Sequence, residues 1–460
     1  MAIRHELAQF CREMTFEALP KEIVEHTKVC LMDHICLMLA GPRTYSEDFP
    51  DIGKFMRDLA GGEESSLVGL RGKLPCLNAT LVNTAIGVST SFDAIHKSTI
   101  IHLPAVLFPA MIAVAERQKA SGKELITATV VGTEIMTRFG MAMGPRNIYA
   151  RGFHPTSVCG PLGCAAGSGK LLGLGLEQMA EALSIAAIQA AGSSVWAGPV
   201  YPATWSFQIA RAAQSGVMAA MLAEIGMRGV DRIFEDERGF LRAYSESSDP
   251  RELTEELGKR YEIKEIILKR FGVGNYVITA IEALIEMIQT HPITADQIEE
   301  ITVKLPTVVM PLVGFPEYPQ NRAASQVSTR YLLAATAYMG SDIEYNLDLS
   351  GLAKRKDPRI IDLFHRIHTA GDPELDKVFP EKKPCIIRIK TKDGKEFSQR
   401  NDGPFKGESE NPLTAEDVET KFKRMAIPVV GKEKANQIID KIKGLDQLDD
   451  VSQLVSLLTV

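Results

Sequence analysis

The chain has 460 residues, of which 45% are hydrophobic and 24% are charged, and its formal net charge at pH 7 is −6. This composition is typical of a globular protein with a large core, and the dispersed charges give no reason to expect a nucleic-acid partner. The seven cysteines include no CxxC pair, which argues against a disulfide framework and against a zinc site. We therefore expect reduced thiols and a cytoplasmic location, with no signal peptide and no membrane contact, because the longest apolar stretches are shorter than the ~20 residues that span a bilayer.

Residues 4–245 are predicted to be mostly helical. Many of the predicted helices are apolar on most faces, so we expect them to be buried in a large bundle. Their frequent Gly and Ala residues suit close contact between helices. The predicted helices lie at residues 22–40, 77–91, 104–120, 124–143, 156–172, 178–192 and 207–225.

The pattern changes near residue 262. Residues 299–306 and 385–391 alternate apolar with polar side chains, as half-buried strands do, and a turn at 392–395 leads into a further strand. From residue 414 the chain is helical again. We therefore predict a mainly α fold in which residues 1–262 and 406–460 form an all-helical domain and residues 263–405 form a smaller inserted α+β lid domain.

The most unusual segment lies between residues 83 and 109. Asp93, His96, Lys97 and His102 fall close together there, framed by apolar sequence and small polar residues. Ionisable groups gathered inside apolar sequence suit acid–base chemistry on a small anion. A solvated loop with incidental charges is the alternative interpretation.

Three further sites hold candidate residues. His154 directly precedes a proline and a small-residue helix, where backbone N–H groups favour a bound anion, although a structural histidine gives the same pattern. Lys269 and Arg270 precede a glycine-containing turn, where they either clamp a carboxylate or are simply solvated. Tyr331 opens an apolar helix and is either a core residue or a proton donor.

Residues 163–170 (GCAAGSGK) do not have the spacing of a phosphate-binding P-loop. Cys164 stands where the first glycine is required, and Leu171 stands where a Ser or Thr would bind the metal ion. A packed glycine-rich helix is the better interpretation.

Taken together, these segments resemble the MmgE/PrpD family, which includes 2-methylcitrate dehydratase, cis-aconitate decarboxylase and iminodisuccinate epimerase. The resemblance covers essentially the whole chain. It implies a helical domain built from both chain ends, a smaller α+β lid, an active site in the cleft between them, and a homodimer. It rests on Asn83 with the block from Phe92 to His102, on residues 152–156 (GFHPT), and on residues 211–216, 238–241 and 411–412.

The chain also departs from the family pattern. Trp205 stands where dehydratases and decarboxylases of the family carry a lysine, and Gln208 stands where they carry a histidine. Gly272 and Gly274 replace a proline and a polar residue. We therefore expect a substrate with fewer carboxylates than a tricarboxylate, or one with an apolar arm against Trp205 and the nearby Trp196.

The resemblance implies removal or relocation of a proton next to a carboxylate or carbonyl, which requires a positioned base and stabilisation of the developing negative charge. We expect His102 or His154 to act as base and the other as acid. Asp93 would orient a histidine, and Tyr331 would protonate a leaving group. The expected substrate-binding residues are His96, Lys97, Arg151, Lys269, Trp205 and Gln208.

A lyase acting on a small carboxylic acid, of the hydro-lyase or decarboxylase type, is favoured, because most named reactions of the family eliminate or decarboxylate. We expect it to use no cofactor and no metal. A cofactor-independent epimerase or isomerase of a small dicarboxylate is the first alternative. A non-catalytic homologue that binds a small acid is the second.

Overall fold

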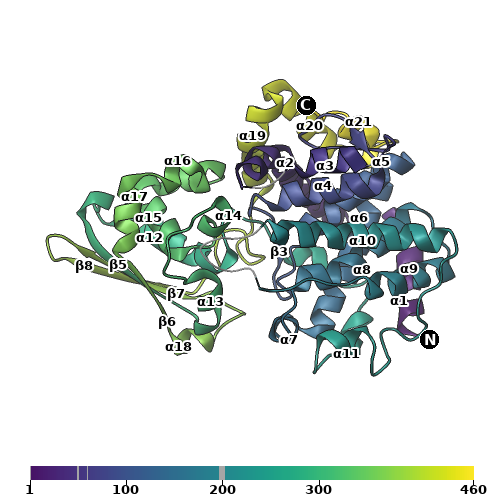
Figure 1. Ribbon diagram of the computed structural model, residues 1–460, viewed down its shortest axis with the longest axis horizontal. Helices are drawn as coiled ribbons and strands as arrows, with labels where there is room; N and C mark the ends of the chain where they lie inside the picture. The colour runs from purple at the N-terminus through teal and green to yellow at the C-terminus, as the bar shows by residue number, and fades with distance from the viewer. Residues whose placement is uncertain (1, 49–50, 60, 196–202) are drawn as a thin grey trace.

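The computed structural model describes residues 2–48, 51–59, 61–195 and 203–460. Most of these residues are helical, which confirms the prediction of a mainly α fold. Figure 1 shows a larger helical part that contains both termini and a smaller part built on a β-sheet.

Helices from the first half of the chain pack around one large apolar core. The central helix is α8, which packs against α5, α6, α9 and α10 and is buried from Pro155 to Gly169. The helices of this half are α1 (Ile3–Glu13), α2 (Lys21–Asp48), α3 (Ile52–Leu59), α4 (Cys76–Val88), α5 (Leu103–Gln118), α6 (Gly122–Met143), α7 (Pro145–Ala150), α8 (Pro155–Leu171), α9 (Leu176–Ile188), α10 (Thr204–Glu224) and α11 (Phe240–Tyr244), and β1 (Ser65–Ser66) pairs with β2 (Lys73–Leu74).

The glycines of α8 and its neighbours allow these helices to approach closely. A Cβ atom at Gly163 would lie 2.7 Å from the carbonyl oxygen of Gly132 on α6. A Cβ atom at Gly216 on α10 would lie 2.4 Å from the carbonyl oxygen of Pro161. Both distances are shorter than a carbon–oxygen contact allows, so larger residues would force the helices apart. The GCAAGSGK segment is therefore a packed helix, as its sequence predicts.

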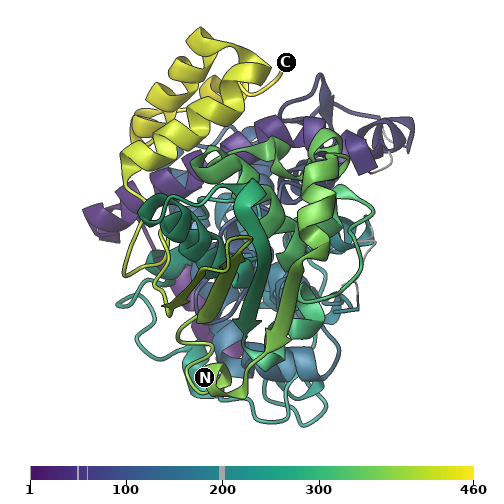
Figure 2. The ribbon, with the colours of Figure 1, turned by 90° about the vertical axis from the view of Figure 1, so that its left-hand side faces the viewer.

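The C-terminal helices return to the helical part. Here α19 (Ala415–Val430) and α20 (Lys432–Lys443) pack against α2, and the short α21 (Ser452–Val455) follows. The backbone N–H of Gly69 donates to the carbonyl of Leu458 over 2.8 Å, and that of Gly122 donates to Leu448 over 2.8 Å. Figure 2 shows these yellow helices beside the purple α2, so both ends of the chain build the same part.

The smaller part has a four-stranded sheet with its own apolar core. The strand order is β6-β5-β7-β8, in which β5 is parallel to β6 and antiparallel to β7, and β7 and β8 form a hairpin. Helices α12 and α15 pack on this sheet (Figure 2). The elements are α12 (Ile278–Thr290), β5 (Ile298–Leu305), α13 (Met310–Val313), α14 (Arg322–Ser325), α15 (Thr329–Met339), α16 (Leu352–Arg355), α17 (Pro358–His365), β6 (Ile367–Gly371), α18 (Pro373–Asp376), β7 (Cys385–Thr391) and β8 (Glu396–Asn401).

A two-stranded ribbon joins the two parts. Strand β3 (Ile95–His96) pairs antiparallel with β4 (Ile266–Ile267). Ile266 belongs to the core of the helical part, whereas Ile95 and Ile267 belong to the core of the smaller part. The ribbon therefore holds the segment that contains Asp93 and His102 next to the segment that contains Lys269. The boundaries at residues 262/263 and 405/406 stay predictions.

The surface and the helices add two findings. Among the described residues, no helix combines the length and the apolar character needed to cross a bilayer.

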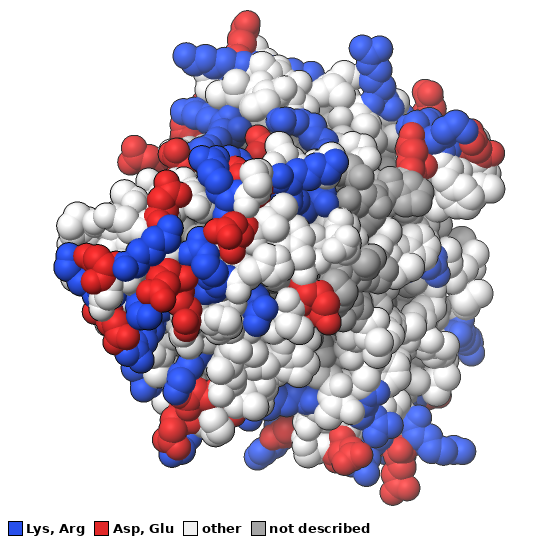
Figure 3. Space-filling model, turned by 60° about the vertical axis from the view of Figure 1, so that its left-hand side comes forward, with Lys and Arg blue, Asp and Glu red and all other residues white. Residues whose placement is uncertain are grey.

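On the face shown in Figure 3, basic and acidic side chains lie intermingled. That face therefore carries no extended field of one sign, as the dispersed charges of the sequence predict.

Candidate active site

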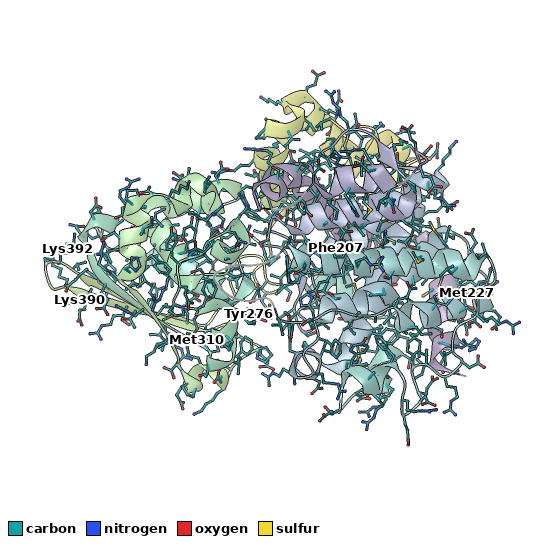
Figure 4. All side chains as sticks on the ribbon, viewed as in Figure 1. Phe207, Met227, Tyr276, Met310, Lys390 and Lys392 are labelled. Carbon is teal, nitrogen blue, oxygen red and sulfur yellow. The ribbon has the colours of Figure 1, made fainter. Side chains whose placement is uncertain are left out.

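A cavity of about 100 Å³ lies between the helical part and the smaller part. This volume is smaller than that of the cavity of about 150 Å³ that holds benzene, so the site suits a ligand of only a few non-hydrogen atoms. Figure 4 shows Tyr276, which lines the cavity, at the junction of the two parts. The lining residues are Ser89, Ser91, Asp93, Ile95, Ile100, His102, Tyr149, His154, Trp205, Ser206, Lys269, Val273, Gly274, Asn275, Tyr276, Leu312, Val313, Ala323, Gln326 and Val327.

Two histidines of the cavity lie at the N-termini of packed helices. His102 precedes α5, His154 precedes α8, and each is followed within two residues by a proline, which favours a helix start. The backbone N–H of His102 donates to Oγ1 of Thr156 on α8 over 2.9 Å. The ring centroids of His102 and His154 are 5.9 Å apart. The structure thus places both imidazoles on the same cavity, although more than fifty residues separate them along the chain.

Asp93 orients His102. Its Oδ2 forms a hydrogen bond with Nδ1 of His102, and its side chain is completely buried. Burial alone would raise the pKa of Asp93, but the charges of His102 and Lys269 and the hydrogen bond lower it to about 2. A carboxylate held in its charged form at Nδ1 leaves the Nε2 side of the His102 ring for a substrate.

His154 lies deeper in the wall and is only 1% exposed. Its Nδ1 lies 3.4 Å from Oγ of Ser157, and its ring contacts Trp205 and Tyr149 with centroid distances of 6.5 Å and 6.1 Å. Burial, together with the charge of His102, holds the pKa of His154 well below 6.5. His154 is therefore a neutral imidazole at pH 7, which is the form that accepts a proton.

Lys269 is the only lysine or arginine among the described residues that line the cavity. Its side chain is 2% exposed, and Nζ donates to the carbonyl oxygen of Ser91 over 3.1 Å. Burial lowers the pKa of Lys269, and the charge of Asp93 opposes that shift. A bound carboxylate would stabilise the ammonium form in the same way, so Lys269 can hold one carboxylate of a substrate.

A buried ion pair between α2 and α19 contacts the backbone of this site. Nζ of Lys421 on α19 lies 2.6 Å from Oδ1 of Asp33 on α2, and neither side chain is exposed by more than 1%. The same ammonium group donates to the carbonyl oxygens of Phe92 over 3.4 Å and of Lys269 over 3.1 Å. Lys421 thus fixes the backbone directly before Asp93 and at Lys269.

Lys421 is not among the site residues expected from the sequence, although its position carries a signal. It lies on the buried face of α19, between Val418 and Phe422, where a lysine is unexpected. Asn83, which contributes to the family resemblance, is structural. Its side chain accepts from the N–H of Val68 and donates to the carbonyl of Ser66, each over 3.0 Å.

Tyr331 does not line the cavity. The expectation that its hydroxyl protonates a leaving group there is therefore wrong. It is completely buried in the core of the smaller part. Its hydroxyl donates to the carbonyl of Leu349 over 2.6 Å, and burial raises its pKa. The hydroxyl proton of Tyr331 is therefore held in a hydrogen bond to Leu349 and does not reach a substrate in the cavity.

Four of the expected substrate-binding residues also lie outside the cavity lining. Each has a partner elsewhere, which accounts for its position. Nδ1 of His96 lies 2.9 Å from Oγ1 of Thr99, Lys97 pairs with Glu410, Arg151 lies 3.6 Å from Glu246, and Gln208 donates to the carbonyl of Ser193 over 3.1 Å.

Of the expected aromatic wall, Trp205 lines the cavity, and its ring centroid lies 5.6 Å from that of His102. Trp196 lies outside the described residues. In the described part of the chain, no cluster of His, Cys, Asp and Glu residues forms a candidate metal site.

Residues 5–253 match the model of the MmgE/PrpD N-terminal domain, and residues 271–447 match the model of the C-terminal domain. The chain belongs to the MmgE/PrpD family. The C-terminal model includes α19 and α20, which pack on α2 here. The family's C-terminal sequence region therefore contributes to both parts of the structure.

Curated relatives of this MmgE/PrpD protein cover nearly its full length. The cis-aconitate decarboxylase-like protein oryM of Aspergillus oryzae is 27% identical over 99% of this chain and 96% of its own. The cis-aconitate decarboxylase of Aspergillus terreus is 25% identical over 99% and 96%. The cis-aconitate decarboxylase of Homo sapiens is 27% identical over 96% and 91%. These relatives support an enzyme of the lyase type.

Proposed function

We propose that this protein is a lyase that acts on a small carboxylic acid by proton transfer at a carbon next to a carboxylate or carbonyl. The observation that carries the proposal is the pair of imidazoles on one cavity, His154 buried and neutral, and His102 bonded to Asp93. The names of the relatives, which are decarboxylases, favour the same reaction class.

We propose a role for each of these groups. In an elimination, His154 takes the proton from carbon, the C–O bond breaks, and the leaving hydroxide takes a proton from His102 to become water. In a decarboxylation, the C–C bond breaks, carbon dioxide leaves, and an imidazolium returns a proton to the carbanion. Asp93 orients the ring of His102 in both cases, and Lys269 holds a carboxylate.

An isomerase is the second candidate. Both imidazoles line the same cavity, and their ring centroids are 5.9 Å apart. One would remove the proton and the other would return it to the opposite face, with no group leaving. The gathering of His102, His154 and Asp93 on one cavity argues against a protein that only binds its ligand, because titratable groups that meet in a cavity are typical of a catalytic site.

The first test is product analysis by NMR with a panel of small mono-, di- and tricarboxylic acids. An alkene with loss of water, or loss of carbon dioxide, indicates a lyase, and an inverted centre without loss indicates an isomerase. Substitution of His154→Gln should lower kcat by about 10²–10⁴-fold. The control is His5→Gln on α1, at the surface, which should keep full activity. Binding without any turnover would contradict the proposal.

The state and location of the protein are proposed on other grounds. The family resemblance supports a homodimer, which light scattering on the purified protein tests. All seven cysteines are buried with free thiols, which supports a cytoplasmic location.

A further inference from the structure

The amide of Asn275 is buried in the cavity wall without a hydrogen-bond partner among the described residues. The residue is 7% exposed, and both Nδ2 and Oδ1 are inaccessible to solvent. It begins a 3-10 turn (Asn275–Val277), directly after Gly274, whose N–H donates to the carbonyl of Gln326 over 2.7 Å. The backbone therefore holds Asn275 in the lining of the cavity.

A neighbouring amide in the same cavity, that of Gln326, is paired, unlike the amide of Asn275. Gln326 lines the same cavity, but its Nε2 donates to the carbonyl of Thr90 over 2.9 Å and its Oε1 accepts from Oγ of Ser91 over 2.9 Å. Buried amides are normally paired in this way, because leaving one unpaired costs free energy of folding. An unpaired amide in a cavity wall therefore indicates a group that is paired when a ligand is bound.

Other polar atoms in the lining point to the same kind of ligand. Oγ of Ser206 is buried without a partner among the described residues, and the side chain is 1% exposed. Lys269 is the only lysine or arginine in the described lining, and Asp93 adds a negative charge. A second or third carboxylate would therefore be buried without a cation, which is costly. An uncharged hydroxyl or carbonyl pairs with an amide at no such cost.

We propose that Asn275 recognises an uncharged hydroxyl or carbonyl group on a substrate with a single carboxylate. The substrate class is that of small hydroxy or oxo monocarboxylic acids. The carboxylate contacts Lys269, Nδ2 of Asn275 donates to the uncharged group, and Oδ1 accepts from it when it is a hydroxyl. The inference rests on the proposed function for the presence of an acid substrate, and it deepens that function by naming the class.

The test is calorimetric binding of matched probes to the full chain. The probes are butanoate, 2- and 3-hydroxybutanoate, 2-oxobutanoate and propane-1,2,3-tricarboxylate. At least one hydroxy or oxo acid should bind about tenfold or more tightly than butanoate, because a site built to pair a polar group discriminates against its absence. In Asn275→Leu, which has a similar volume and no amide, this preference should disappear. Gln9→Leu, at an exposed amide on α1, should keep it.

Thermal unfolding of the ligand-free variants separates recognition from a structural role. Asn275→Leu should unfold at the same temperature as the natural protein or higher, because it removes an unpaired buried amide. A clearly lower unfolding temperature would show that the amide has a structural partner and would overturn the inference. Equal affinity for hydroxy acid, oxo acid and butanoate, failure of all of them to bind, or tightest binding of the tricarboxylate would also overturn it.

These experiments distinguish a failure of the proposed recognition by Asn275 from a failure of the proposed lyase reaction. If the preference for a hydroxy or oxo acid depends on Asn275 but no product forms, the result supports the recognition and contradicts the lyase reaction. Turnover of a tricarboxylate that Asn275→Leu performs normally would sustain the lyase and contradict the recognition.

Discussion

At the scale of single residues, the site depends on two imidazoles in different environments. His102 lies against a carboxylate, whereas burial deprives His154 of the water that would stabilise its charge. Two titratable groups whose surroundings differ in this way are suited to opposite roles in proton transfer. The unpaired amide of Asn275 adds recognition to this arrangement.

The lowered pKa of His154 predicts how stability changes with pH. A histidine that is harder to protonate in the folded protein contributes stability that is complete above its unfolded pKa of about 6.5 and is lost as the pH falls below it. Urea unfolding of the natural protein should show this loss between pH 7 and pH 5. His154→Gln should lose clearly less stability over that interval, because glutamine does not titrate.

His34 provides the background for this comparison. Burial lowers its pKa to about 4, so it contributes a similar loss to both proteins. Unfolding curves whose pH dependence is the same with and without His154 would contradict the proposed environment of its ring.

Sequence patterns identified some of the site residues for clear reasons. Asp93, His102 and His154 are polar groups within apolar or glycine-rich sequence, and a fold with a cavity there brings such groups together. Tyr331 could not be excluded in this way, because its partner, the carbonyl of Leu349, is a backbone group with no sequence signal. The role of Asn275 could not be predicted from the sequence either, because the amide is left unpaired only by the packing of its turn.

At the scale of elements, the N-terminal α2 and the C-terminal α19 meet behind the site. Burial raises the pKa of Asp33, and the ammonium group of Lys421 opposes that shift. Sequence periodicity predicted that both segments are helices. It could not show that Lys421 lies against Asp33, because nearly the whole chain separates them.

Loss of Lys421 should therefore affect both stability and activity. Lys421→Met leaves Asp33 buried without a counter-charge and should cost about 3–5 kcal/mol of unfolding free energy. The control is Lys423→Met on the same helix, which removes a partly exposed pair with Glu419 and should cost less than about 1 kcal/mol.

A double variant separates the two roles of this lysine. Asp33→Asn with Lys421→Met should regain much of the stability, because no buried charge is left unpaired. Its kcat/KM should stay low, because the carbonyls of Phe92 and Lys269 still lack their donor. Recovery of both stability and full kcat/KM would contradict a positioning role.

At the scale of the whole molecule, the cavity lies where two parts with separate cores meet. Phe92, which directly precedes Asp93, packs on Gly272 at the start of the smaller part. The change from helical to alternating sequence predicted the two parts. It could not predict their junction, because β3 and β4 have two residues each, too few for a pattern.

This contact predicts the effect of a single methyl group. A Cβ atom at Gly272 would lie 2.2 Å from the ring of Phe92. Gly272→Ala should therefore cost about 1–3 kcal/mol in urea unfolding and lower kcat/KM, because the residue that must shift, Phe92, directly precedes Asp93 in the chain. Gly61→Ala is the control, because nothing lies within 4 Å of its added Cβ. Equal behaviour of the two variants would contradict close contact at the junction.

The central claim is that a buried neutral His154 exchanges a proton with a carbon atom of a small acid. The most direct test is to incubate the protein in D2O with the acid panel and to follow deuterium at carbon by NMR. The account predicts incorporation with at least one acid for the natural protein and a loss of about 10²–10⁴-fold in its rate for His154→Gln. Incorporation at the full rate in that variant, or neither incorporation nor product with any acid in the natural protein, would contradict the account.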